Sequence, residues 1–111
     1  MNISERQEGD VTILDVSGKI TIGVGDVAVR DAVQTALSSG SLKILVNLEE
    51  VSTIDSAGVG ELVSAYTTVA NRGGRLKLLN LPPKVNDILQ ITQLITVFEV
   101  HDDEREAIAS F

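Results

Sequence analysis

The chain has 111 residues, a length that predicts one domain spanning residues 1–111 around a single core. Hydrophobic residues make up 43% of it, but only Tyr66, Phe98 and Phe111 are aromatic, so that core must be mainly aliphatic. A net charge of −7 argues against binding to nucleic acid or anionic membranes, because both favour a cationic face. The absence of cysteine excludes disulfides, thiolate metal sites and a cysteine nucleophile.

Targeting signals are not evident in the sequence. No apolar run approaches the roughly 18 residues that a membrane-spanning helix needs. The first residues, Met1 to Glu5, lack the basic and apolar start of a secretory signal. We therefore expect a soluble protein in the cytoplasm.

The chain is predicted to open with an antiparallel hairpin. Ile3–Gln7 and Val11–Val16 are β-prone runs, and the acidic, glycine-containing segment between them suits a tight turn. Gly18–Ile22 resumes the alternation of the second run after a glycine, which indicates a strand extended past a bulge.

A glycine motif follows the hairpin. Gly23 to Ala28 spell G-x-G-x-x-A between a predicted strand and a predicted helix over Asp26–Leu37, as in dinucleotide-binding folds. The chain is too short for two mononucleotide-binding halves, and Asp15 interrupts a strand that should be buried on both faces. A flexible loop with Asp26 as the helix N-cap is the favoured interpretation.

The rest of the chain alternates between strands and helices. Apolar runs predict strands at Leu42–Leu48, Arg75–Leu79 and Thr96–Val100. Helices are expected after the polar turn of Val51–Gly60, after the proline pair at 82–83, and after the acidic residues 102–104. Alternation after a hairpin predicts an α/β fold: a mixed, mainly parallel sheet of four to five strands with an N-terminal antiparallel hairpin and about four helices.

The turn between the central strand and the best helix is the candidate site. Ser56 follows Asp55 at a helix start, where the first N–H groups are unpaired and partially positive, so its hydroxyl should face solvent. Serine is also an ordinary N-cap, and taken alone that interpretation is favoured. Against it, Gly58 and Gly60 each cost the first helical turns about 0.8 to 1 kcal/mol relative to alanine. The outer face of the helix is expected to be small and weakly charged, which suits docking, and to comprise Glu61, Ser64, Ala65, Thr68 and Arg72.

Catalytic and metal sites are weakly indicated. The only histidine, His101, could join Ser56 in a hydrolase, but the elbow pattern G-x-S-x-G is absent because Ile54 replaces the first glycine. The acidic pairs at 49–50 and 102–103 are more typical of solvated surface than of a cation site. We expect no metal and no catalytic residue.

Asp55-Ser56-Ala57-Gly58-Val59-Gly60, between a strand and an amphipathic helix, resembles the signature Asp-Ser-(Ser/Ala)-Gly-aliphatic-Gly of STAS domains, and the preceding segment 47–51 supports the resemblance. The most similar subgroup is the anti-sigma-factor antagonists. The resemblance implies that Ser56 is phosphorylated by an anti-sigma factor that is a serine kinase, that phosphorylation releases this partner, and that a phosphatase restores the active form. ATP would belong to the kinase, so the chain would be a binding module and substrate without a cofactor, not an enzyme.

The resemblance leaves several points open. Antagonists often carry an acidic residue near the position of Thr21, and Asp26 either replaces it or only caps its helix. The partner surface would comprise Asp55, Ser56, Ala57, Gly58, Gly60, Glu61, Ser64, Ala65 and Thr68. Two alternatives are a STAS scaffold or phospho-relay component of a stress-sensing assembly, and a nucleotide-binding module that uses the Gly23–Gly25 loop.

Overall fold

The computed structural model describes all residues from 1 to 111. Its sheet has the strand order β1-β2-β3-β4-β5, with β1 antiparallel to β2 and the other pairs parallel. The predicted α/β class, the mixed sheet and the N-terminal hairpin are confirmed. The elements are β1 (Asn2–Glu8), β2 (Val11–Ile20), α1 (Gly25–Ser38), β3 (Lys43–Ile54), α2 (Ser56–Asn71), β4 (Arg75–Leu79), α3 (Pro83–Ile91), the 3-10 helix η1 (Leu94–Thr96), β5 (Val100–His101) and α4 (Glu104–Ala109).

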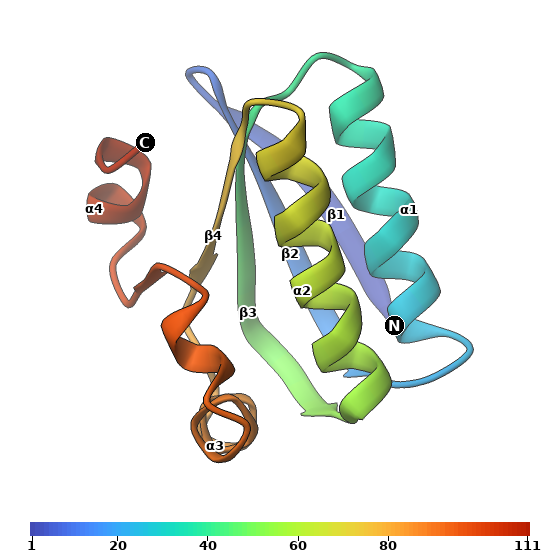
Figure 1. The fold of residues 1–111 in the computed structure, drawn as a ribbon. Coiled ribbons are helices and arrows are strands. Elements are labelled where there is room, and N and C mark those ends of the chain that lie inside the picture. Colours follow the sequence, from blue (N-terminus) through green and yellow to red (C-terminus); the bar gives the residue numbers. More distant parts are fainter.

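The helices lie on both faces of the sheet. α1 and α2 run side by side over one face, and α4 lies on the other (Figure 1). A cluster of 21 buried residues fills the space under α1 and α2, with α3 contributing Val85 and Leu89. A second cluster of five residues, Val11, Ile13, Leu45, Leu79 and Ala107, lies under α4. None of the helices combines the length and apolar character needed to cross a bilayer.

The hairpin ends earlier than predicted, and the central strand ends later. β2 contains the predicted bulge but stops at Ile20, and Ile22 is 74% exposed in the following loop. β3 instead continues through Val51 to Ile54, which pairs with Ile20. Val51 and Ile54 are buried, whereas Ser52 is exposed and Thr53 is half-buried. This mixture of polar and apolar residues made the second half of the strand resemble a polar turn in the sequence.

The last strand exists but is shorter and lies further along the chain than the predicted Thr96–Val100. Thr96 ends a 3-10 helix, and only Val100 and His101 pair with β4. Phe98 turns into the core instead, where its ring meets Tyr66 edge to face at 5.6 Å between centroids. Burial of one aromatic ring thus outweighs the β propensity of the neighbouring valines and threonine.

Candidate functional site

Asp55 joins the start of α2 to the loop between β2 and α1. It is the N-cap of α2, and its Oδ1 accepts the N–H of Gly58 at 2.9 Å. Its Oδ2 accepts the N–H of Ile22 at 3.0 Å. The bond from Ile22, followed by that from Gly58, holds the pKa of the Asp55 carboxyl below its usual range. One ionised side chain therefore fixes the loop beside the α2 turn.

Ser56 is the first residue of α2 and is exposed, as predicted. The N-cap interpretation of this serine is wrong, because Asp55 occupies that position and makes the capping hydrogen bond. The Ser56 hydroxyl makes no hydrogen bond within the chain. It is therefore available to a second molecule at a helix N-terminus where the Gly58 N–H already binds the Asp55 carboxylate.

The two glycines of the turn have different roles. A Cβ atom at Gly58 would overlap the carbonyl oxygen of Ile20 and lie 2.7 Å from Cγ1 of Ile54, so only glycine lets α2 approach the end of β2. A Cβ atom at Gly60 would meet nothing within 4 Å, and Gly60 is exposed. Packing thus requires glycine at position 58, whereas nothing in the fold requires glycine at position 60.

The predicted outer face of α2 requires a correction. Glu61 is 8% exposed and Ala65 is 3% exposed, and Thr68 is half-buried. The Glu61 carboxylate accepts from Nη2 of Arg30 on α1 at 3.1 Å, so this side of α2 faces its neighbouring helix. Sequence periodicity did not show that α1 packs alongside α2 and covers a second stripe.

The exposed face of α2 is rotated around the helix axis by about one residue relative to the predicted face, and only Ser64 of α2 belongs to both. We call it the outer row; it contains only small or uncharged residues, namely Ser56, Gly60, Ser64, Thr67, Ala70 and Asn71. Of the expected face, Ser64 and Arg72 are exposed as predicted. A row that begins at Ser56 and carries no charge can meet a partner surface with little desolvation of ions.

Sequence reasoning missed an apolar patch beside the turn. Ile22 is 74% exposed, Val24 is 65% exposed and Val27 is 38% exposed, all in or next to the loop held by Asp55. The signal was present as aliphatic residues flanking glycines in a segment that we interpreted as a strand extension and a flexible loop. We call these three residues the loop patch.

The α1 N-terminus bears on the nucleotide alternative. Asp26 is not the N-cap, which is Val24, but its Oδ1 accepts the N–H groups of Gly23 and Val27, each at 2.8 Å. A Cβ atom at Gly25 would overlap the Lys19 carbonyl oxygen. The N–H groups that would bind a phosphate are thus occupied by a carboxylate, and the second glycine serves packing. This geometry disfavours the phosphate-loop interpretation.

His101 belongs to another part of the molecule. Its Nε2 lies 2.6 Å from Oε2 of Glu99 and 3.3 Å from the Ser110 hydroxyl. Both contacts use the same ring nitrogen, whereas a triad needs the acid and the hydroxyl on opposite nitrogens. No group of three histidine, aspartate or glutamate side chains is placed to hold a metal.

Comparison with known proteins decides the family. A sequence profile of the STAS domain matches residues 2–107, almost the whole chain. The chain belongs to the STAS domain family. Among characterised STAS proteins, the anti-sigma-B factor antagonist of Bacillus subtilis is 30% identical over 103 residues, covering 90% of this chain and 92% of its own.

Solved structures agree with the fold. A crystallised protein of Thermotoga maritima superposes with a TM-score of 0.88 at 26% identity, covering 97% of this chain and 92% of its own. The Bacillus cell fate determinant SpoIIAA in its phosphorylated form superposes with a TM-score of 0.74 at 23% identity, covering 98% of both chains. The predicted STAS resemblance is therefore confirmed.

Proposed function

We propose that this STAS protein is an anti-sigma factor antagonist. It binds an anti-sigma factor that is a serine kinase, which frees a sigma factor, and phosphorylation of Ser56 by that kinase ends the interaction. A phosphatase acting on phospho-Ser56 restores binding. The observation that carries the proposal is the exposed Ser56 hydroxyl, left unbonded because Asp55 already caps α2. The anti-sigma-B factor antagonist relative and the phosphorylated SpoIIAA structure support it.

The proposed partner surface combines the outer row with the loop patch. Asp55 holds these two features together through Ile22 and Gly58, so a partner that reaches Ser56 also meets exposed aliphatic side chains. Gly60 has no packing reason to be glycine, and a close approach of the partner backbone supplies one. Glu61 and Ala65 are buried and contribute by positioning α2, not by contact.

In this proposal the chain acts as a substrate and binding module in the cytoplasm, and ATP belongs to the partner. At both helix starts near the site a carboxylate already occupies the place of an anion: Asp26 binds the N–H groups of Gly23 and Val27, and Asp55 binds that of Gly58, which disfavours a nucleotide of this chain's own. Titration of the isolated protein with ATP and GTP should release no measurable heat of binding.

Phosphosite mapping tests the proposed switch. Incubation with the anti-sigma factor kinase captured from the native cell and with ATP should place phosphate on Ser56 alone. Ser56→Ala should abolish labelling, while the control Ser52→Ala, which removes another exposed hydroxyl on β3, should leave it unchanged. Full labelling of Ser56→Ala would remove the basis for this assignment.

A second test probes the outer row. Ser64→Arg should weaken kinase binding about tenfold or more, because a bulky cation must be desolvated at a small, uncharged contact. Ser4→Arg, on the exposed β1 strand, is the matched control and should bind normally. Equal affinities of the two variants by titration calorimetry would mean that the partner docks elsewhere.

A further inference from the structure

The loop between β2 and α1 carries aliphatic side chains that the fold does not bury. Ile22 is 74% exposed and Val24 is 65% exposed, and Val27 at the start of α1 adds a third aliphatic group that is 38% exposed. An aliphatic side chain in water forgoes the free energy that burial supplies, and several of them together mark a binding surface more often than single exposed residues do. The loop patch therefore needs an explanation outside the fold.

Two aspartates fix the backbone of this loop. The N–H of Ile22 donates to Oδ2 of Asp55 at 3.0 Å, and the N–H of the next residue, Gly23, donates to Oδ1 of Asp26 at 2.8 Å. The same Oδ1 accepts the N–H of Val27, which ties the loop to the first turn of α1. Successive peptide groups of the loop are thus bound to the starts of two different helices. We call this pair of aspartates the loop clamp.

The loop offers a partner no charge. Residues 21–24 are threonine, isoleucine, glycine and valine. Asp26 is only 9% exposed and its Oδ1 is bonded inward, so it does not supply the acidic partner contact that its position in the sequence left open. Asp55 also caps the helix that begins with Ser56, so a partner that reaches the Ser56 hydroxyl meets a fixed aliphatic surface beside it.

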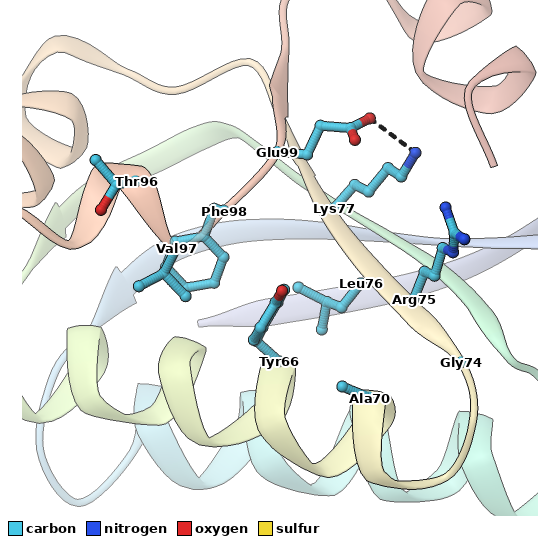
Figure 2. Close-up of a pocket in the computed structure, with 10 residues that line it drawn as sticks. All are labelled: Tyr66, Ala70, Gly74, Arg75, Leu76, Lys77, Thr96, Val97, Phe98 and Glu99. Carbon is cyan, nitrogen blue, oxygen red and sulfur yellow. Dashed lines mark ion pairs between the residues drawn. The ribbon is translucent and has the colours of Figure 1, made fainter.

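The loop patch projects from the molecule and does not line its main cavities. Three cavities of about 530, 520 and 480 Å³ are lined by other residues. The first lies beside the C-terminal half of α2, between Tyr66, Phe98 and the ion pair of Lys77 with Glu99 (Figure 2), whereas Ser56 begins the same helix at its other end. A projecting aliphatic side chain suits a pocket in another protein better than it suits a small ligand.

We propose that the loop patch is an apolar anchor that enters an aliphatic pocket of the anti-sigma factor and determines which kinase this chain recognises. The inference rests on the proposed function, because it assigns a chemistry to the partner that phosphorylates Ser56. Asp26 and Asp55 are positioning residues: the loop clamp orders the anchor before binding, so less conformational freedom is lost in the complex. An apolar anchor discriminates between kinases by the shape and polarity of the pocket that receives it.

Removal of the anchor tests the contact. Ile22→Ser should lower affinity for the anti-sigma factor kinase captured from the native cell about tenfold or more, and should raise KM for phosphorylation of Ser56 while kcat stays within about twofold. Ile91→Ser, which changes an 82%-exposed isoleucine on α3, is the matched control and should bind as the wild type does. The ratio of wild-type to Ile22→Ser affinity should not change with salt concentration, because salt screens charged contacts and not apolar ones.

Two further substitutions distinguish apolar from electrostatic recognition. Ile22→Leu should keep affinity within about threefold, since it retains the volume and the apolar character of the side chain. Ile22→Asp should weaken binding at least as much as Ile22→Ser, because a carboxylate would be desolvated in an apolar pocket. Binding of Ile22→Asp that equals or exceeds that of the wild type would overturn the proposal and would show that the partner places a cation here.

Asp26 tests the loop clamp from inside the fold. Asp26→Ala removes the acceptor of both N–H groups and should weaken kinase binding about threefold or more, whereas Asp26→Asn keeps an oxygen acceptor and should restore most of the affinity. In Asp26→Ala, the additional change Ile22→Ser should cost less affinity than it does in the wild type, because the loop no longer presents the side chain. An equal cost in both backgrounds would show that Asp26 does not act through the anchor.

Failure of this inference is distinguishable from failure of the proposed function. If the wild type binds the kinase and is phosphorylated on Ser56 while Ile22→Ser binds as tightly as Ile91→Ser, the anchor is wrong and the proposed function stands. If the wild type neither binds the kinase nor is phosphorylated by it, both are wrong. Amide NMR spectra of each variant verify that a loss of binding occurs in a folded protein.

Discussion

At the scale of single residues, the two glycines of the α2 turn separate folding from function. Gly58 is required by the close approach of α2 to Ile20, whereas nothing within 4 Å requires glycine at position 60. Both cost helix stability in the same way, so a sequence alone ranks them equally. Only the tertiary structure, in which the end of β2 lies against Gly58, distinguishes the role of Gly58 from that of Gly60.

Paired substitutions test this difference. Gly58→Ala should destabilise the protein by about 1 to 3 kcal/mol, the usual cost of overpacking. Gly60→Ala should stabilise it by up to about 1 kcal/mol, because alanine is the better helix former in open space. Urea unfolding measures both. A loss of stability in Gly60→Ala would mean that Gly60 has a packing role, and our argument for a partner contact would fail.

The Asp55 cap predicts a pH dependence. Its folded-state pKa is lowered by hydrogen bonds from Ile22 and Gly58, so its stabilising effect is complete above the unfolded value of about 3.9. The effect is lost as the pH falls through the lower folded value. Asp55→Ala should therefore be less stable than wild type at pH 7, and the two should converge in stronger acid.

The control for this experiment is Asp87→Ala, which removes an exposed carboxylate of α3 that accepts no hydrogen bond. Denaturant midpoints between pH 7 and pH 2 give the comparison. A stability difference for Asp55→Ala that persists unchanged at pH 2 would show that the cap acts through the aspartate packing and not through its charge.

At the scale of elements, α4 is held to the sheet at both ends. Near its start, Glu104 and Arg6 form an ion pair, and Arg6 also binds Asp15 at 2.6 Å. The hydrogen bond with Glu104, followed by that with Asp15, raises the pKa of the Arg6 guanidinium. At its end, Nζ of the 4%-exposed Lys77 donates to the Ser110 carbonyl and hydroxyl, each at 2.8 Å. This short helix and Phe111 just beyond it cover the second apolar cluster, so these polar contacts help to keep the helix in place.

Lys77→Met should loosen α4 selectively. Methionine keeps the apolar contact but leaves the Ser110 carbonyl without its donor, at a cost of about 1 to 3 kcal/mol. Hydrogen exchange should accelerate in α4 and not in α2. Lys19→Met, at an exposed position, is the control. Equal acceleration in both helices would instead indicate global destabilisation.

In the wild type, strong acid should likewise accelerate hydrogen exchange in α4. Lys77, followed by His101, lowers the pKa of Glu99 to about 2 from 4.5, so the contribution of Glu99 is complete above pH 4.5 and is lost as the pH falls through about 2. In Lys77→Met this acid-dependent part of the α4 protection should shrink.

Sequence patterns predicted correctly those elements that are determined by contacts between residues close together in the chain. The hairpin, the bulge and the starts of α3 and α4 follow from local turn, proline and acidic-residue chemistry, and the STAS motif identified Ser56. The buried side of α2 at Glu61 and Ala65 depends on α1, and the failed strand at Thr96–Val100 depends on the contact between Phe98 and Tyr66. Both are long-range contacts that no local pattern contains.

At the scale of the whole molecule, the proposed switch depends on where phosphate changes the free energy. A phosphate adds about −1.5 to −2 charges at neutral pH. In the free protein it meets the positive end of α2, a gain of roughly 0.3 to 1 kcal/mol, but it also meets Asp55, which remains ionised and already uses the Gly58 N–H. These opposing effects are similar in size, so the stability of the free protein should change little.

In the complex, the same charge would be desolvated against a surface shaped for a neutral hydroxyl, at a cost of about 2 to 5 kcal/mol. At about 1.4 kcal/mol per factor of ten, phosphorylation of Ser56 should lower affinity for the anti-sigma factor by tens- to thousands-fold. Ser56→Asp should reproduce this only in part, and Ser56→Ala should keep binding. Melting temperatures and affinities of both forms decide the matter: a large melting shift with unchanged affinity would replace the interface mechanism with a conformational one.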